Sequence, residues 1–254
     1  MHSRVSFAAL VVLSFAACGW GEPPEPQVSE PVTSPPQVGV LAEAPVPFEL
    51  GAEQAKGRVV YETMCWSCHG SAGRGDGPAV QAGAVAPPRN LITGDISGPA
   101  VRRLQADFRA EVGSLDPDHP HMQNVLSIID LEAFASALAY LPALAYPPEL
   151  PGSALAGHRN YVLRCQGCHG ASGQGNGPGA EVLEIRPSDF TRDTLLAARD
   201  FEGAFRKVRT GGGDVHGSSM PAWGVMFNDG DVWDLVAYIA TFQPGVLSAP
   251  PSGG

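Results

Sequence analysis

Two copies of a Cys-x-x-Cys-His motif carry the chemistry that this sequence can perform. Their residues are Cys65, Cys68, His69, Cys165, Cys168 and His169. Two thiols three residues apart on a helical turn can add to the two vinyl groups of one haem as thioethers. The adjacent histidine can then bind the haem iron as an axial ligand. The two motifs therefore predict two covalently bound haem c groups.

Other uses of paired cysteines fit the sequence less well. Cys68 and Cys165 are 97 positions apart, whereas zinc ribbons use about 15–20 residues between their cysteine pairs. A thioredoxin-like site needs a βαβ context, and no alternating strand pattern stands out in the chain. Disulfides remain possible in an exported protein. None of these three alternatives explains a histidine directly after both motifs.

The chain of 254 residues contains two copies of one sequence repeat. Residues 70–78 and 170–178 follow the two motifs and share glycines at the same spacing, and the offset through this stretch is 100 residues. Two tandem domains explain such a repeat better than one domain does. Each unit is predicted to contain a first helix that leads into the motif, a long irregular loop and a last helix.

Capping residues and prolines set the expected helix limits. Asp130 is a suitable N-cap for the last helix of the first unit, which should stop before Pro142. Asn228 or Asp229 can cap the last helix of the second unit, which should end before Pro244. The two first helices are expected over residues 52–64 and 154–164.

Residues 52–145 and 152–245 each resemble a class I cytochrome c domain, and the pair resembles a bacterial di-haem cytochrome c. Domains of this family pack their first and last helices crosswise through a glycine and aromatic side chains. The matching residues here are Gly57, Tyr61, Tyr140, Gly157, Tyr161 and Tyr238. The resemblance implies an all-α fold with two tandem domains, each a small helical fold wrapped round a covalent haem.

The resemblance also implies a sixth iron ligand from the loop before each last helix. Met220, followed by proline, matches the family's methionine in the second domain, and Met122 lies at the corresponding place in the first. His119 and His121 are neighbouring alternatives to Met122. Met226 is expected to pack in the core. The predicted axial ligands are therefore His69, Met122, His169 and Met220.

Further residues are expected around the irons. In the family a proline carbonyl accepts the imidazole N–H of the axial histidine, and Pro88 and Pro187 lie at that place. Arg89 and Arg186 could pair with haem propionates, with ordinary surface charge an equal alternative. His158 and His216 match no motif of the family, so we expect both at the surface.

The first residues are predicted to be a targeting segment. Residues 5–17 are mostly apolar and too short to span a membrane, which fits a signal peptide over residues 1–17. The segment ends in Phe-Ala-Ala-Cys-Gly, which resembles the lipobox of bacterial lipoproteins and predicts cleavage before Cys18 and its lipidation. An ordinary export signal cut after Ala17 is the alternative. Gly19 resembles the signal for sorting to the outer membrane in Gram-negative bacteria.

The remaining parts of the chain follow from composition. Residues 22–48 are rich in proline, which predicts an extended tether. The expected organisation is a signal peptide at 1–17, a lipidated cysteine and tether at 18–51, cytochrome c domains at 52–145 and 146–245, and a flexible tail at 246–254.

These observations together predict a function. The net charge of −10 argues against binding to nucleic acid. With both axial positions filled, the irons would exchange electrons with redox proteins by outer-sphere transfer at the periplasmic face of a membrane, through transient docking. A haem enzyme of the di-haem peroxidase kind, or an electron-transfer subunit of a dehydrogenase or respiratory complex, is the alternative. A cysteine-ligated haem, as in thiosulfate-oxidising enzymes, is disfavoured because Cys18 is the only cysteine outside the motifs.

Overall fold

A computed structural model describes residues 43–92, 128–213 and 215–251 of the chain. The described residues form helices and turns without a β-strand, which confirms the all-α fold. Among these residues no helix is long and apolar enough to cross a membrane.

The helices of the first domain are α1 (Ala52–Val60), η1 (Tyr61–Cys65), α2 (Trp66–His69), α3 (Pro78–Gln81) and α6 (Leu131–Leu144). The helices of the second domain are α7 (Ala154–Arg164), α8 (Gln166–His169), η2 (Pro178–Val182), η3 (Phe190–Arg192), α9 (Thr194–Ala197), α10 (Phe201–Thr210), η4 (Trp223–Val225) and α11 (Asp229–Ala240).

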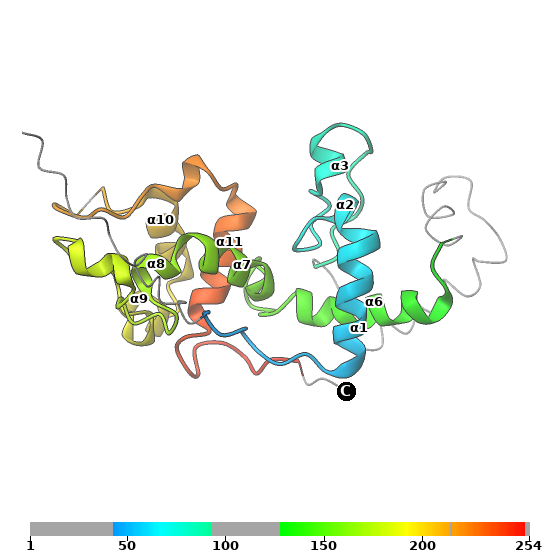
Figure 1. The fold of residues 1–254 in the computed structure, drawn as a ribbon, viewed down its shortest axis with the longest axis horizontal. Helices are drawn as coiled ribbons and strands as arrows, with labels where there is room; N and C mark the ends of the chain where they lie inside the picture. The colour runs from blue at the N-terminus through cyan, green and yellow to red at the C-terminus, as the bar shows by residue number, and fades with distance from the viewer. Residues whose placement is uncertain (1–42, 93–127, 214, 252–254) are drawn as a thin grey trace, which may run out of the picture. The chain divides into compact units, whose positions relative to one another are not determined.

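The first and last helices of each domain cross in close contact, α1 on α6 and α7 on α11 (Figure 1). A Cβ atom on Gly57 would lie 1.9 Å from the Ser136 carbonyl oxygen, and one on Gly157 would lie 1.9 Å from that of Asp234. Only glycine permits backbones to approach this closely. The predicted crossing through glycine is therefore confirmed in both domains.

Buried tyrosines pack beside each crossing. The ring centroids of Tyr61 and Tyr140 lie 5.7 Å apart in the first domain, and those of Tyr161 and Tyr238 lie 5.1 Å apart in the second. All four side chains are at most 2% exposed. Aromatic pairs at such distances stabilise a core beyond the area that they bury.

The last helix of the first domain differs from its predicted limits. Asp130 caps α6 as expected, because its side chain accepts a hydrogen bond of 2.8 Å from the amide of Ala133. The helix does not stop before Pro142 but continues through it to Leu144. Leu141 and Leu144 are both buried in the core of this domain. Burial of these side chains offsets the roughly 3 kcal/mol that an internal proline costs a helix.

The other helix limits follow the sequence more closely. Helix α7 covers residues 154–164 as predicted, and Asn228 caps α11 in a capping box with Asp231. The predicted helix over 52–64 is interrupted, since α1 ends at Val60 and one π-helical turn leads on to Cys65. Single π-turns inside helices often lie at functional sites.

The end of the predicted tether packs against the second domain, and we call residues 43–47 the N-terminal strap. The amide of Ala44 donates to Oε1 of Gln166 at 2.8 Å, and its carbonyl accepts from Nε2 of His158 at 2.8 Å. The hydroxyl of Tyr238 donates to the Pro45 carbonyl at 2.7 Å. The strap, which lies within the predicted tether of residues 18–51, thus contacts the second domain.

One expectation is corrected by this packing. His158 is only 9% exposed and stacks edge-on against Tyr238, so the prediction of a surface residue is wrong; His216 is exposed, as predicted. The first residues of the predicted C-terminal tail, which begins at residue 246, pack against the described chain. Val246 is 6% exposed, and the amide of Ser248 donates to Oε1 of Glu149 at 2.7 Å.

Candidate haem-binding sites

The second motif lies on a single helical turn at the start of α8. The amide of Cys168 donates to the Cys165 carbonyl at 3.1 Å, and the amide of His169 donates to the same oxygen at 2.9 Å. This winding places Cys165, Cys168 and His169 on one helical turn. Sequence spacing alone predicts this arrangement, because residues three and four apart are neighbours on a helix.

Cys65, Cys68, Cys165 and Cys168 form no disulfide with one another. Burial raises the pKa of Cys65 to about 11 and that of Cys165 to about 12. Redox-active cysteines instead have a lowered thiol pKa. The environment of these thiols therefore fits a structural role, such as a thioether bond to haem, better than disulfide exchange.

The imidazole of His169 is held from two sides. Its ring stacks on Phe190 with centroids 4.5 Å apart, and its Nδ1 donates to the Ser188 carbonyl at 3.2 Å. Burial lowers the pKa of His169, so the neutral ring is favoured. With Nδ1 engaged, Nε2 is the nitrogen left to bind iron, and such an outer hydrogen bond fixes the ring and tunes the metal.

The acceptor of this hydrogen bond differs from the prediction by one residue. The sequence predicts the Pro187 carbonyl as the acceptor, whereas in the structure the acceptor is the Ser188 carbonyl. The Pro187 carbonyl faces Gly175 instead, where a Cβ atom would lie 2.2 Å from it. Because successive carbonyls of extended chain point in opposite directions, the next carbonyl faces the histidine. Arg89 and Arg186 are both exposed.

The glycine-rich loop after the motif closes back on it. Gly170, Gly173 and Gly175 all have positive φ, a conformation that favours glycine. The amide of Gly175 donates to the His169 carbonyl at 2.9 Å, and that of Gly177 donates to the Cys168 carbonyl at 3.0 Å. The loop thus fixes the backbone of the candidate ligand.

The first motif has the same frame. The amide of Gly75 donates to the His69 carbonyl at 2.9 Å, and that of Gly77 donates to the Cys68 carbonyl at 3.0 Å. A Cβ atom on Gly75 would lie 2.3 Å from the Pro88 carbonyl, which repeats the relation of Gly175 to Pro187. The repeat in sequence is therefore a repeat in hydrogen bonding.

Met220, the predicted distal ligand of the second site, lies on a loop that a backbone hydrogen bond closes. The amide of Gly212 donates to the Met220 carbonyl at 3.0 Å, and Gly211 has a positive φ. Met220 is partly buried and packs against the same core cluster that contains Phe190, the residue on which His169 stacks. Met226 is 61% exposed, so the prediction that it packs in the core is wrong.

Several predicted residues lie outside the described part of the chain. They are Cys18, Met122, His119 and His121. The distal ligand of the first site and the lipid attachment therefore stay predictions.

The residues present fit covalent haem. Within the described ranges, no group of three or more His, Cys, Asp or Glu side chains is arranged to hold a metal ion. Each motif instead offers two thiols and one imidazole beside a glycine loop, and the second adds an oriented imidazole N–H. When bound, haem c supplies a one-electron iron couple whose potential depends on its axial ligands. Fold and site together define a c-type cytochrome with two haem domains.

Comparison with known proteins gives the family. Residues 54–141 match the family described as cytochrome c, and residues 152–239 match the family described as cytochrome c oxidase, cbb3-type, subunit III. The chain therefore contains two tandem cytochrome c domains, the arrangement of a di-haem c-type cytochrome.

Two bacterial proteins are similar over most of this chain. It is 27% identical over 205 residues to the cbb3-type cytochrome c oxidase subunit FixP of Azorhizobium caulinodans, covering 78% of this chain and 63% of the relative. It is 27% identical over 195 residues to the cbb3-type cytochrome c oxidase subunit FixPc of Rhizobium leguminosarum bv. viciae. This match covers 75% of this chain and 61% of the relative. The chain thus spans less than two thirds of the length of these relatives.

A solved structure is also similar. It is a chain of the reducing HAO-like protein complex Kustc0457/Kustc0458 of Kuenenia stuttgartiensis, at 25% identity and a TM-score of 0.33, covering 80% of this chain and 100% of that one.

Sequence reasoning missed three features of the site region: the Ser188 acceptor, the N-terminal strap on Gln166, and an ion pair between Arg74 and Asp234. The sequence contains an indication of this ion pair. Arg74 corresponds to the uncharged Gln174 of the second repeat, and Asp234 corresponds to the uncharged Ser136 of the first.

Proposed function

We propose that this chain passes electrons between two haems and external redox proteins, without binding a reactant at either iron. The observation that supports this best is the second site, where His169 is held by Ser188 and the Met220 loop packs against the same core cluster. A protein that supplies ligands to both faces of an iron leaves no open position for a substrate. Electrons must then enter and leave at the haem edge.

The proposed residues divide into three roles. Cys65, Cys68, Cys165 and Cys168 would hold the two haems as thioethers, His69 and His169 would bind the irons on one face, and Met122 and Met220 would bind them on the other. The same glycine frame closes on both proximal histidines. The domain limits proposed for these sites are residues 52–145 and 146–245.

The polypeptide would tune the reduction potential of the second iron by orienting the His169 imidazole and by supplying Met220 as a ligand. The Ser188 carbonyl keeps the proton of His169 on Nδ1, which makes Nε2 the better electron donor to iron. Histidine–methionine ligation raises the reduction potential, so a second domain with Met220 in place would be a relatively oxidising carrier.

The proposed location is the periplasmic face of a membrane, with the outer membrane favoured if the source is Gram-negative. Cys18 would be the lipidated residue that anchors the chain after removal of residues 1–17. Several acyl chains on one residue give stable anchoring, since each buried CH₂ contributes about 0.8 kcal/mol. A Cys18→Ala variant should leave the membrane fraction, and unchanged membrane association would contradict the anchor.

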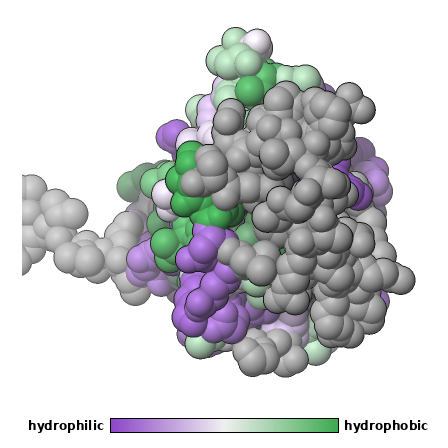
Figure 2. All heavy atoms as spheres, turned by 90° about the vertical axis from the view of Figure 1, so that its right-hand side faces the viewer, coloured by the Kyte–Doolittle hydropathy of each residue, from purple (hydrophilic) through white to green (hydrophobic). Residues whose placement is uncertain are grey.

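Partners are proposed to dock transiently on exposed apolar surface. Around the second site, Val182 and Val225 are 86% and 91% exposed. In the first domain, exposed apolar residues of the α3 region lie at the top of Figure 2, and Val85 is 38% exposed. Small apolar patches of this kind suit a weak interface that permits release.

A second candidate is a fixed subunit of a respiratory complex. It is favoured by the two relatives, both of which are cbb3-type cytochrome c oxidase subunits. Purification of the tagged chain from membranes in mild detergent separates the two. A stoichiometric complex with other haem proteins supports the subunit, and isolation of the chain alone supports a carrier.

Redox spectroscopy tests the proposal against a haem enzyme. We expect two low-spin haems by optical and EPR titration, and no turnover with hydrogen peroxide. A high-spin haem in the resting protein, or peroxide turnover, would favour a peroxidase-like enzyme instead.

A further inference from the structure

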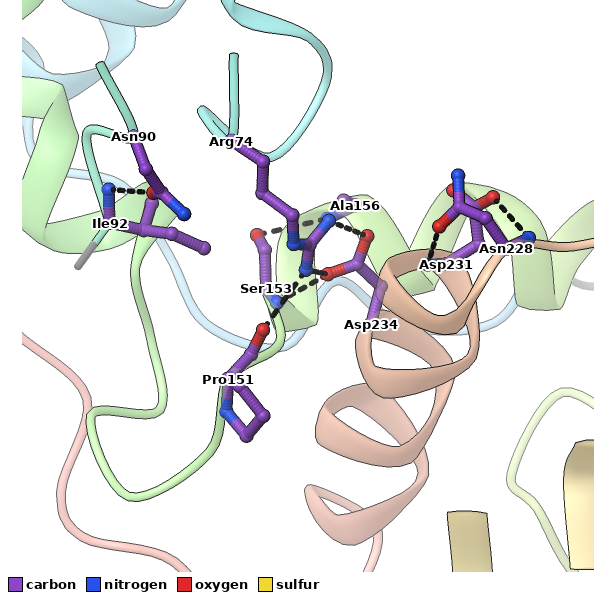
Figure 3. Close-up of polar contacts among 9 residues, drawn as sticks. All are labelled: Arg74, Asn90, Ile92, Pro151, Ser153, Ala156, Asn228, Asp231 and Asp234. Carbon is purple, nitrogen blue, oxygen red and sulfur yellow. Dashed lines mark hydrogen bonds and ion pairs between the residues drawn. The ribbon is translucent and has the colours of Figure 1, made fainter. Parts of the chain in front are cut away.

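A buried ion pair joins the loop after the first motif to the last helix of the second domain (Figure 3). Nη1 of Arg74 donates to Oδ2 of Asp234 at 2.9 Å, and Nη2 of Arg74 donates to Oδ1 of the same carboxylate. Nη2 also donates to the Pro151 carbonyl at 3.2 Å. A planar guanidinium is suited to such paired contacts with a carboxylate.

Little of this pair is accessible to solvent. The side chain of Asp234 is 1% exposed and that of Arg74 is 14% exposed. Oδ1 of Asp234 also accepts the amide of Ser153 at 2.6 Å, at the N-cap of α7. The carboxylate is thus bound from the first domain and from the linker before the second, and removal of either charge would leave the other buried without its partner.

Arg74 lies in the loop that closes on the first motif, and Asp234 lies where α11 crosses α7, the helix that leads into the second motif. Arg74 stands directly before Gly75, whose amide donates to the carbonyl of His69. Asp234 is on α11, at the point where Gly157 of α7 contacts its carbonyl oxygen. A movement at the ion pair would therefore move one candidate haem site relative to the other.

The repeat itself does not require this contact. Gln174 holds the place of Arg74 in the second domain and is exposed. Ser136 holds the place of Asp234 in the first, since its carbonyl contacts Gly57 as that of Asp234 contacts Gly157. Each domain folds round its motif without an Arg–Asp pair at these positions, so the pair serves the junction between them.

We propose that Arg74 and Asp234 are positioning residues for electron transfer between the two haems. Their ion pair fixes the first haem-attachment loop against the last helix of the second domain. This inference rests on the proposed electron-transfer function. Because the rate of electron transfer falls steeply as the distance between two haems grows, a junction that fixes this distance favours rapid transfer.

The test exchanges residues between the repeats in the full chain. Arg74→Gln and Asp234→Ser each introduce the residue of the other repeat, and the double variant combines them. Lys56→Gln is the control, because it removes an ion pair with Glu53 whose side chains are 59% and 53% exposed. If Asp234→Ser fails to fold, the test uses Arg74→Gln and Arg74→Lys, the second of which retains the positive charge.

Two measurements are made on each variant. Spin labels at Val59→Cys and Val182→Cys, two exposed positions in the two domains, report the distribution of inter-domain distances by pulsed EPR. Photoreduction of one haem reports the rate of transfer to the other. The first measurement does not depend on redox activity.

We expect Arg74→Gln and Asp234→Ser to broaden the distribution of inter-domain distances and to slow electron transfer between the haems several-fold. The double variant should be no slower than the slower single variant, because both remove the same interaction. Arg74→Lys should fall between Arg74→Gln and the unsubstituted chain, and Lys56→Gln should match the latter.

If Arg74→Gln kept a narrow distribution of inter-domain distances and an unchanged transfer rate, this inference would be overturned. The proposed electron-transfer function would not be affected. Absence of transfer between the haems of the unsubstituted chain would instead contradict the proposed function and remove this inference with it.

Discussion

The hydroxyl of Tyr161 donates a hydrogen bond of 2.6 Å to the carbonyl oxygen of Gly170, the residue after the candidate ligand His169. Tyr61 makes the same bond to Gly70 at 2.8 Å. Burial raises the pKa of both hydroxyls, which therefore stay protonated and donate. Each first helix is thus bonded to the loop that closes its haem site.

Tyr161→Phe should weaken the second domain. The substitution keeps the ring but leaves a buried carbonyl without its donor, which costs about 1–3 kcal/mol of unfolding free energy. Guanidinium unfolding followed by Soret absorbance measures the change. Thr210→Val is the control, since its hydroxyl bonds to Arg206 on an exposed face and should matter little. Equal stability of Tyr161→Phe and the unsubstituted chain would contradict the role of this bond.

Gly157→Ala should disrupt the crossing of α7 and α11. The added methyl group would lie 1.9 Å from the Asp234 carbonyl oxygen, so the two helices must separate. We expect a loss of about 3 kcal/mol or more, or no folded second domain. Circular dichroism and haem content after expression report the outcome.

Gly167→Ala is the matched control for this substitution. Nothing lies within 4 Å of a Cβ atom on Gly167. If both variants were equally stable, close packing at the crossing would not be the reason for Gly157.

Features set by local sequence could be predicted, whereas contacts between distant segments could not. Asp130, Asn228 and the glycines of the motif loop act on residues only a few positions away, and their roles are confirmed. Helix α6 passes Pro142 because of burial in the tertiary core, which local propensity does not contain.

The candidate sites show the same division. Spacing placed Cys165, Cys168 and His169 on one turn. The choice of Ser188 over Pro187 depends on the direction of a single carbonyl in an irregular loop. His158 was assigned to the surface because its partner, Ala44, is 114 residues away in a segment that composition alone made a tether.

Gln166→Leu should release the N-terminal strap. The substitution removes the acceptor of the Ala44 amide, a buried bond across 122 residues. We expect a loss of about 1–3 kcal/mol and faster proteolysis before residue 48. Gln174→Leu, at an exposed position, should change neither. Identical cleavage rates in the two variants would argue against the strap.

Titration of the Asp234 carboxyl should contribute to the pH dependence of the free energy of unfolding. Burial raises the pKa of its carboxyl from 3.8 to about 6, although Arg74 acts in the opposite direction. The folded state therefore binds this proton more tightly than the unfolded chain does. The contribution to stability is present at low pH and is lost as the pH rises through about 6, with a slope of at most about 1.4 kcal/mol per pH unit.

Asp234→Asn should remove this component of the curve between pH 4 and about 7. Asp189→Asn provides a control of opposite sign. Hydrogen bonds from Thr191 and Arg192 lower the pKa of Asp189, so its contribution is lost as the pH falls. Unfolding curves of Asp234→Asn that keep the full pH dependence of the unsubstituted chain would contradict this assignment.

Spectropotentiometric titration with EPR, on the full chain and on Met220→His, tests the account most directly. We expect two low-spin haems per chain, and in the variant a fall in the potential of one haem with the other unchanged, because methionine ligation raises the potential. Fewer than two haems per chain, immediate cyanide binding to the isolated protein, or identical titrations of the two proteins would contradict ligation of the second iron by His169 and Met220.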